Sequence, residues 1–221
     1  MQLTLQNRRL ALLALACTAL AGCASTQPVA YTGLSSAPQL RTHPDERSTH
    51  TPYRLAANTD WRRYTKAIVA PVAIYQGADQ QFEDVADGDK TRLAGAMRDE
   101  FRQKLAQRFA LVDSPAADTL LIELTLTGAK TTTPFLSTAT RFDLVGAPYN
   151  IVQAIRGKEG SFTGSVSYAV EIYEASTHAL LAAFVSKQYP NALNLKASLG
   201  SLDASIAGIR IGADELLAFF K

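Results

Sequence analysis

The sequence predicts an α+β fold: an antiparallel-rich sheet of about four strands, with two main helices packed on one face. Two segments place large apolar residues at helical spacing, several others alternate apolar and polar residues, and two of the latter lie close enough to form a hairpin. The elements follow the order strand, helix, strand, long loop, strand, strand, helix. Hairpins and separated helices are typical of an α+β layer, so we expect one such layer.

The first predicted strand covers residues 66–75, where apolar and β-branched residues predominate. This composition indicates a strand that is covered on both sides. Pro71 lies inside the strand, however, and proline is confined to edges and bulges because it has no amide hydrogen to donate. We therefore expect a bulge at Pro71, next to an edge position. The folded domain is predicted to begin shortly before this strand, near Trp61.

Two amphipathic helices are predicted. The first covers 91–109, where large apolar residues recur every four positions and form one stripe that faces the core. The second covers about 201–220, where apolar residues step by three and four. Gly208 and Gly212 lower the intrinsic helix propensity of this segment, and close packing against the sheet would explain their spacing. The stripe of the first helix consists of Leu93, Met97, Phe101, Leu105 and Phe109.

Three further strands follow the first helix. Residues 119–127 alternate apolar and polar positions, as a half-buried strand does. Residues 165–172 and 179–188 are predicted to pair as a hairpin, joined by the turn at 174–178. Between these strands, residues 130–160 contain apolar and aromatic side chains without a clear period. Connections of this length are uncommon in compact domains and are often functional loops.

The N-terminal region carries a targeting signal. An arginine pair is followed by a short apolar run, and residues 20–23 then read Leu-Ala-Gly-Cys. A basic start, a short apolar run and small residues at the cleavage point are typical of a secretory signal peptide. A cysteine directly after the small residues resembles a bacterial lipobox. We therefore predict a signal peptide over 1–22, cleavage between Gly22 and Cys23, and lipid attachment at Cys23. An ordinary signal peptide with an incidental cysteine is the alternative.

The predicted mature chain begins with a tether and continues as one domain. Residues 24–53 are rich in Ser, Thr, Pro and Gln, which favours a lipidated, flexible tether over 23–57. Residues 58–221 suffice for a single α+β domain. No stretch after the lipidated cysteine is apolar and long enough to span a bilayer, so the lipid alone is expected to hold the chain on a membrane. Ala24 occupies a place where Asp implies retention in the inner membrane of bacteria, which favours the outer membrane and a periplasm-facing domain.

Charge and cysteine content exclude several functional classes. The chain has 22 Lys and Arg against 20 Asp and Glu, and two arginines lie in the predicted signal peptide, so 20 of each sign remain. A neutral domain lacks the basic surface that nucleic acids require, and we expect no nucleic-acid partner. Cys17 leaves with the signal peptide and Cys23 carries the lipid. Thiolate nucleophiles, cysteine metal sites and disulfides are therefore excluded from the predicted domain.

No constellation of catalytic or metal-ligating residues stands out, so we expect neither an enzyme, nor a cofactor, nor a metal site. His43 and His50 lie in the predicted tether and His178 in the hairpin turn, where we expect solvated side chains. Residues 160–164 read Gly-Ser-Phe-Thr-Gly, but the serine is misplaced for a nucleophile elbow and a strand follows instead of a helix. The acidic residues within 83–89 fit a solvated loop before a helix, whose N-terminus favours negative charge.

The apolar residues of 130–160 are the remaining candidate for a functional surface. They either cover the open face of the sheet, or line a groove or a partner-binding patch. An apolar cavity there would favour the binding of a small apolar or lipid ligand, whereas a flat patch would favour a protein partner. The candidate surface residues are Phe135, Phe142, Tyr149 and Ile155.

Three motifs resemble an uncharacterised family of proteobacterial envelope lipoproteins, of the domain-of-unknown-function type. They are Tyr31-Thr32-Gly33-Leu34, then Tyr64-x-Lys66-x-x-Val69-x-Pro71-Val72, and the hairpin over 171–183. The resemblance covers most of the mature chain, and it implies location and fold type but no activity. His178 stands at or near a position where the family pattern has glycine, and a positive φ there is costly for histidine.

These observations lead to one main prediction and one alternative. We expect a membrane-anchored lipoprotein with a non-enzymatic role, which binds an envelope protein or helps to assemble one. The alternative is a carrier or sensor of a small apolar or lipid ligand, held between the sheet and the 130–160 loop.

Overall fold

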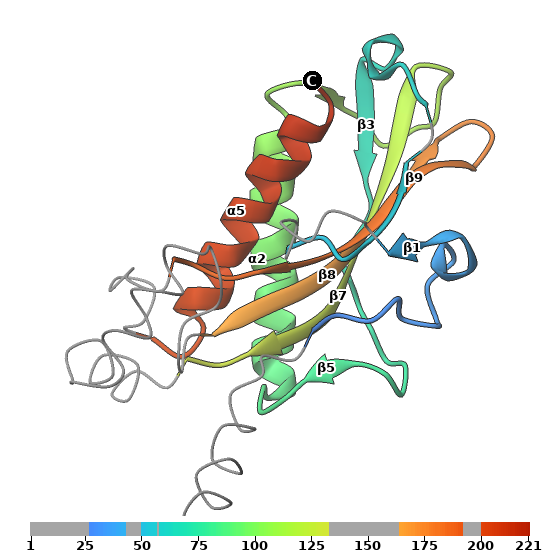
Figure 1. The fold of residues 1–221 in the computed structure, drawn as a ribbon. Coiled ribbons are helices and arrows are strands. Elements are labelled where there is room, and N and C mark those ends of the chain that lie inside the picture. The colour runs from blue at the N-terminus through green and yellow to red at the C-terminus, as the bar shows by residue number, and fades with distance from the viewer. Residues whose placement is uncertain (1–26, 43–49, 57, 133–163, 192–199) are drawn as a thin grey trace, which may run out of the picture.

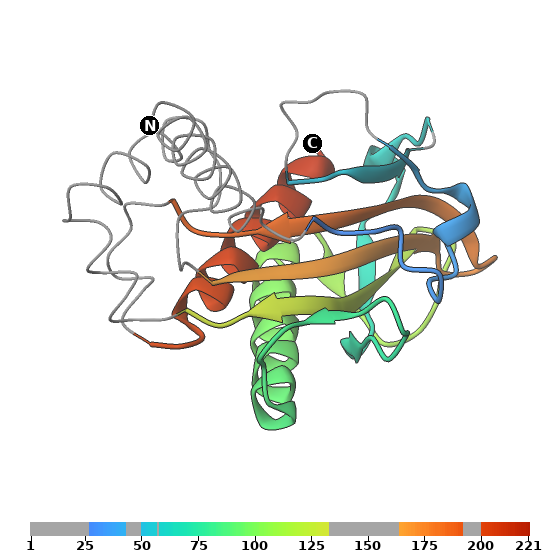
Figure 2. The same ribbon diagram turned by 60° about the horizontal axis from the view of Figure 1, so that its bottom comes forward.

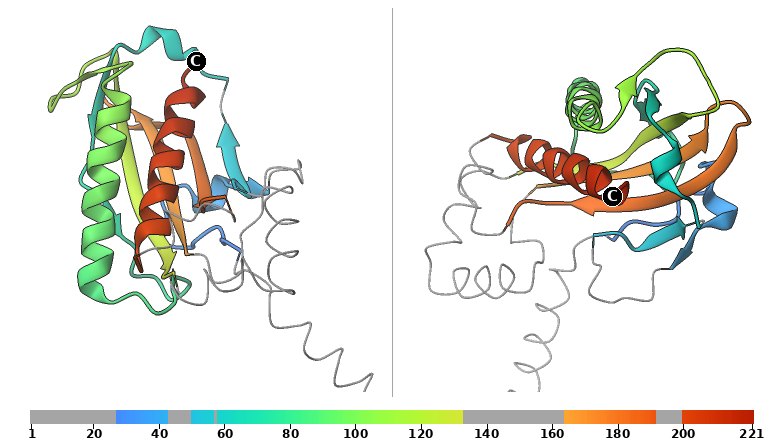
Figure 3. Two further views of the ribbon diagram at one scale, coloured as in Figure 1. Left: turned by 90° about the vertical axis from the view of Figure 1, so that its left-hand side faces the viewer. Right: turned by 90° about the horizontal axis from the view of Figure 1, so that it is seen from above.

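The structure is a computed structural model that describes residues 27–42, 50–56, 58–132, 164–191 and 200–221. In this part of the chain, two long helices lie side by side on one face of a nine-stranded sheet, as Figure 1 and Figure 3 show. The strands are β1 (Arg41–Thr42), β2 (Tyr53–Ala56), β3 (Lys66–Val69), β4 (Ala73–Ile74), β5 (Gln81–Phe82), β6 (Ala110–Leu111), β7 (Thr119–Lys130), β8 (Ser165–Glu174) and β9 (Ala179–Gln188). The helices are α2 (Asp87–Leu105) and α5 (Asp203–Phe219), with 3-10 turns η2 (Ala37–Gln39) and η3 (Trp61–Arg63).

This sheet corrects the prediction of an antiparallel-rich sheet with about four strands. Its order is β1-β2-β9-β8-β7-β3-β6, and β4 and β5 also pair with β7. The pairs from β1 to β7 along this order are antiparallel, whereas β3, β4 and β5 run parallel to β7, and β6 runs parallel to β3. The parallel half arises because α2 forms the crossover between β3 and β7. Strands of two to four residues are too short to show a period in the sequence, so β1, β2 and β5 were missed.

The first predicted strand is interrupted at its proline. β3 ends with Val69 opposite Ile122, and β4 begins with Ala73 opposite Thr125. The interrupted strand therefore has one residue more than β7 over this stretch, as a bulge does. Pro71 lies in this stretch with the extra residue, as predicted. β6 pairs with β3 only at Lys66 and Ala67, so Pro71 lies beyond that pairing.

Both predicted helices are present and run parallel to each other, but α2 covers Asp87–Leu105 instead of 91–109, so Phe109 of the predicted stripe lies beyond its end. The apolar stripe of α2 is buried against the sheet, as its spacing predicts. The guanidinium of Arg210 on α5 donates to the Glu100 carboxylate on α2 at 2.9 Å, and one turn further on Lys104 pairs with Asp214. The contact points move toward the C-terminus on both helices, from Glu100 to Lys104 on α2 and from Arg210 to Asp214 on α5. Both helices therefore begin at the same end of the sheet. None of the helices among the described residues is long and apolar enough to cross a membrane.

Two glycines allow α5 to lie close to the sheet. A Cβ atom at Gly208 would lie 2.9 Å from the carbonyl oxygen of Gln188, and one at Gly212 would overlap the hydroxyl of Tyr168. Both glycines are buried. Close packing against the sheet, which the sequence analysis proposed as the reason for their spacing, is confirmed.

The face of the sheet opposite the helices is covered by residues 27–40, which we call the strap. In Figure 2 the strands cross in front of both helices and the strap, in blue, lies in front of the strands; Figure 3 shows helices and strap on opposite sides. Tyr31, Leu34 and Leu40 of the strap are buried, and they form a second apolar cluster with Tyr75 and the central strands.

The strap differs from the flexible tether predicted over 23–57. In the described part of that segment, residues 27–40 pack on the sheet and β2 pairs with β9. Three large apolar side chains, spread over ten residues, are too few to raise the mean hydropathy of the segment. They suffice for docking because the sheet offers them an apolar surface.

Replacing Gly212 with alanine tests the close approach of α5. We expect Gly212→Ala to lower the free energy of unfolding by about 1–3 kcal/mol, because the new methyl group overlaps the Tyr168 ring. Gly95→Ala on α2 is the matched control: no atom lies within 4 Å of its Cβ position, so the higher helix propensity of alanine should stabilise the fold by up to about 1 kcal/mol. Urea denaturation followed by circular dichroism measures both. Shifts of equal sign and size would contradict the packing described here.

Candidate functional site

Two glutamates lie opposite each other on the strap-covered face of the sheet. Glu123 of β7 and Glu171 of β8 are partners in the antiparallel register. Their side chains point away from the helices because they alternate with the buried Ile122 and Leu124 of the main core. Glu171 is only 5% exposed, whereas Glu123 is partly exposed. Like charges directly opposite each other destabilise a sheet, so this pair needs partners that compensate.

The strap supplies one of these partners. The backbone N–H of Ser36 donates to Oε1 of Glu171 at 2.6 Å, across 135 residues of sequence. The hydroxyl of Tyr173 also donates to the Glu171 carboxylate, and Ser35 is a further hydrogen-bond partner of Tyr173. Hydrogen bonds to an ionised carboxylate are about twice as strong as neutral ones. Glu171 therefore ties the strap to the centre of the sheet.

The hairpin turn adds a histidine to this group. His178 adopts a left-handed backbone conformation with φ of 55°. Its ring stacks on the Tyr173 ring, with the ring centroids 4.5 Å apart and an interplanar angle of 3°. Stacking offsets the cost of the positive φ, which explains how a histidine is held where glycine would be easier to accommodate. We call Glu123, Glu171, Tyr173 and His178 the acidic cluster.

The environment shifts the acid–base properties of this cluster. Burial, and then the neighbouring Glu171 carboxylate, raise the pKa of Glu123 above its usual range, although His178 opposes this effect. Burial and the two carboxylates raise the pKa of Tyr173 to about 12. Such shifts often mark functional sites, but buried structural networks also produce them. Here Glu171 and Tyr173 hydrogen-bond each other and the strap, so the geometry fits a latch.

The strap is held at a second place by tyrosine and aspartate. The Tyr31 hydroxyl donates to Oε1 of Gln81 at 2.8 Å, and burial raises the pKa of Tyr31 to about 12. The backbone N–H of Thr32 donates to the Asp79 carboxylate at 2.9 Å, and this bond is the main reason why the pKa of Asp79 is lowered. The Tyr75 hydroxyl accepts from the N–H of Gly33 and donates to Asp79. The first family-like motif thus consists of residues that dock the strap.

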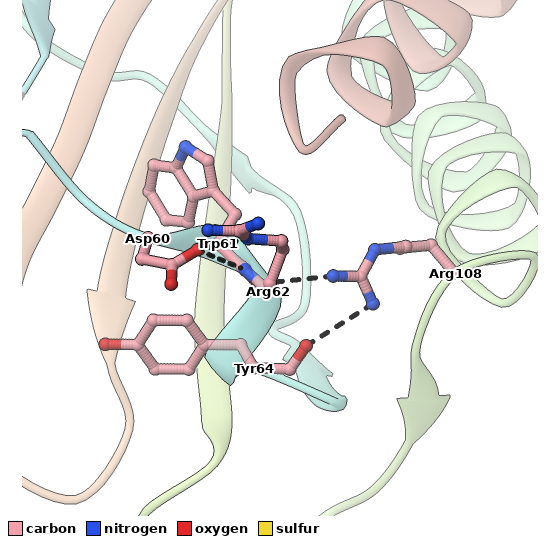
Figure 4. Close-up of polar contacts among 5 residues, drawn as sticks. All are labelled: Asp60, Trp61, Arg62, Tyr64 and Arg108. Atoms are coloured by element: carbon pink, nitrogen blue, oxygen red, sulfur yellow. Dashed lines mark hydrogen bonds and ion pairs between the residues drawn. The ribbon is translucent and has the colours of Figure 1, made fainter.

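An aromatic corner lies at the end of the sheet where β3 begins. The Arg108 guanidinium donates to the carbonyl oxygens of Trp61 and Tyr64, at 3.2 and 3.4 Å, as Figure 4 shows. The Trp61 ring packs against Phe219 and Phe220 at the end of α5, with centroid distances of 5.4 and 5.3 Å. These five residues form what we call the aromatic corner. It holds the predicted start of the domain against the last turn of α5.

The acidic residues near α2 match the loop-and-helix interpretation. Asp84 accepts from the hydroxyl of Thr131 at 2.6 Å, and this bond lowers the pKa of Asp84. Asp87 and Asp89 lie in the first turn of α2 and form ion pairs with the helix residues Lys90 and Arg92. Within the described ranges, no group of three or more His, Cys, Asp or Glu residues is placed to hold a metal ion.

Several predicted site residues cannot be placed. All of them lie outside the described residues: Gly22, Cys23, His43, Phe135, Phe142, Tyr149 and Ile155. His50 is described, and it is more constrained than a solvated tether residue. Its Nδ1 lies 3.0 Å from the carbonyl oxygen of Lys187, and its ring contacts Tyr189. The acidic cluster was missed because alternating polar residues in a strand indicate solvent exposure unless a distant segment covers them.

The pH dependence of stability tests the state of Glu123. Since its pKa is raised in the fold, the stability gained from this group is present below the unfolded pKa of about 4.3 and is lost as the pH rises through the folded value. We expect Glu123→Gln to stabilise the protein at pH 8 by roughly 0.2–1 kcal/mol, with a smaller effect at pH 4. Urea denaturation at both pH values measures this. The control Glu100→Gln removes a partly exposed ion pair with Arg210 and should give no stabilisation at pH 8. A Glu123→Gln effect that is equal at both pH values would contradict the raised pKa.

Comparison with known proteins places the chain in a family. No curated protein matches it. Two similar solved structures are the PelC dodecamer from Paraburkholderia phytofirmans and protein XCC0632 from Xanthomonas campestris, which belongs to the DUF330 family. Each is 10% identical to this chain with a TM-score of 0.37. The first match covers 76% of this chain and 91% of the other, and the second covers 75% and 89%. Similarity at this level says nothing about function.

The match to a protein family is more extensive. The DUF3313 family, described as proteins of unknown function, matches residues 30–216. This range includes all three motifs on which the resemblance is based, and it confirms an uncharacterised family of the domain-of-unknown-function type. Attachment to lipid and a proteobacterial source stay predictions. The chain belongs to the DUF3313 family.

Proposed function

We propose that the chain is a lipid-anchored lipoprotein of the bacterial outer membrane, whose domain faces the periplasm and binds or helps to assemble an envelope protein without catalysis. Support for the anchor comes from the sequence, where Leu-Ala-Gly-Cys follows a basic start and a short apolar run. Ala24, in place of aspartate, supports the outer membrane.

The docked strap is the observation that carries this proposal. Pro28 is buried and Tyr31 is 1% exposed, only five and eight residues after Cys23. A lipid on Cys23 would therefore hold a folded domain at the membrane surface. An arrangement of this kind suits a protein that presents a fixed surface to a neighbour in the envelope.

The interactions of the ionisable side chains in the acidic cluster are consistent with a non-catalytic role. In the acidic cluster, Glu171 accepts hydrogen bonds from the strap and from Tyr173, and Ser35 of the strap is a further partner of Tyr173. General acid–base catalysis needs a group that reaches a substrate proton. Glu171 is instead covered by the strap, which favours a structural role. The described part of the same face is filled by Tyr31 and Leu34, so a ligand carrier would have to rely on residues 133–163.

Lipid attachment is tested with a cysteine variant. In a proteobacterial host we expect wild-type protein to incorporate radiolabelled palmitate and to sediment with the outer membrane. Cys23→Ser should incorporate none and should leave the membrane fraction. Ala24→Asp should keep the lipid but move the protein to the inner membrane, whereas the control Ala24→Ser should not. Palmitate incorporation into Cys23→Ser would contradict the proposed anchor.

The binding role is tested by site-specific crosslinking in the native envelope. A photoreactive amino acid is placed at Arg62, beside the aromatic corner, and at Ile211, an exposed apolar residue on α5. We expect one envelope protein to be captured from one of these surfaces and not from the other, because a specific interface covers part of the domain. Mass spectrometry identifies it, and purification through that protein should recover this chain. If no protein is captured and lipid co-purifies, the carrier alternative replaces the proposed role.

A further inference from the structure

We infer that the domain stands on the membrane with one defined end, the end at which α2 and α5 begin, and that the aromatic corner points away from the bilayer. This inference rests on the proposed lipid attachment at Cys23. We call the membrane-facing part the anchor end, and among the described residues it comprises 81–92, 128–132 and 200–205.

The strap enters the domain at the anchor end. The carbonyl oxygen of Gln27 accepts a hydrogen bond from Nε2 of Gln81 at 2.8 Å. Gln81 on β5 is the register partner of Gly128, which lies near the C-terminal end of β7. Figure 1 shows β5 and the start of α2 together at the lower edge of the molecule, with the C-terminus at the opposite edge.

Chain length limits the distance between the lipid and this end. Three residues lie between Cys23 and Gln27, so four Cα–Cα steps join them. Since an extended chain spans at most about 3.6 Å per residue, Gln27 lies within about 14 Å of the lipidated residue. The predicted tether of some 30 residues would have allowed any orientation, but a link of three residues does not.

The aromatic corner lies much farther away. β7 has 12 residues and α2 has 19, which correspond to lengths of about 40 and 28 Å. β3 begins beside the start of β7, and α5 ends beside Trp61, so the corner marks the end opposite the anchor end. With Gln27 close to the bilayer, a standing domain holds Trp61 and the C-terminal helix end about 30–40 Å from it.

The described residues of the anchor end do not form a basic surface that would bind anionic lipids. The described side chains there comprise five acidic residues and three basic residues: Glu83, Asp84, Asp87, Asp89 and Asp203 against Lys90, Arg92 and Lys130. Adsorption to anionic headgroups requires clustered basic residues. The strap offers no such surface either, because residues 27–40 contain no Lys or Arg, and Arg41 next to it is a single basic residue. The lipid on Cys23 is therefore the group expected to bind the bilayer, and the described charged side chains of the anchor end are not.

Single introduced cysteines test the orientation. Cys23 is the only cysteine of the predicted mature chain, and lipid would block it, so a new cysteine alone takes a fluorophore. We choose Gly88→Cys at the anchor end, Ser114→Cys beyond β6 at the opposite end, and Gln39→Cys on the strap side. Each lipidated protein is placed in phosphatidylethanolamine–phosphatidylglycerol vesicles whose headgroups carry a nitroxide quencher.

We expect the label at position 88 to be quenched several-fold more strongly than the label at position 114. Quenching of the label at position 39 should be intermediate. Stronger or equal quenching at 114 would overturn the orientation, and strong quenching at all three positions would also overturn it, because the domain would then lie flat.

The full-length Cys23→Ser variant should not bind unlabelled vesicles. Salt-sensitive binding of this variant would show that charge sets the orientation, and it would also overturn the inference. The mass of the N-terminal peptide, from the same samples, separates the two proposals. An unlipidated Cys23 overturns both, whereas a lipidated Cys23 with reversed quenching overturns the orientation alone.

Discussion

The long antiparallel pairing of β7 with β8 is the constraint on which the rest of the structure depends. Ten pairs of residues along these strands fix which side chains face each side of the sheet. One side receives Ile122, Leu124 and their neighbours, and this apolar surface binds α2 and α5. The other side receives glutamates and small residues. A one-residue slip in this register would exchange the two sides and would remove both the helix interface and the strap interface.

The helices on one face of the sheet and the strap on the other are held by different kinds of interaction. The helices are held by the burial of a large apolar surface, in which aromatic and aliphatic side chains pack closely. Glycines occupy the positions where α5 approaches the sheet most closely. The strap has fewer apolar side chains and adds directed hydrogen bonds to Glu171, Asp79 and Gln81. Directed bonds fix position more strictly than apolar contact does. This explains how 14 residues with only three large buried apolar side chains hold one arrangement.

The elements predicted from the sequence are those whose period extends over several residues. Both helices, the 119–127 strand and the hairpin were predicted correctly because each contains four or more apolar residues at a regular helical or strand spacing. The strap was not, because its Tyr31 and Leu34 have no period, and their partners lie more than 40 residues away, at Tyr75, in β5 and in the central strands. The acidic cluster was missed for the same reason. Glu123 and Glu171 alternate with apolar residues, as exposed residues do, and only the covering segment makes Glu171 a buried group.

The separation in sequence between the strap and its docking surface has a consequence for the timing of folding. Ser36 is made early in synthesis, but Glu171 is made 135 residues later, and the β8–β9 hairpin must form before the surface is complete. Contacts between such distant residues form slowly, because the chain must first close a long loop. The N-terminal segment therefore stays undocked while most of the chain is being made. If the N-terminus is processed as we propose, the enzyme would have access to it in this interval, and completion of the sheet would end that access by immobilising the segment.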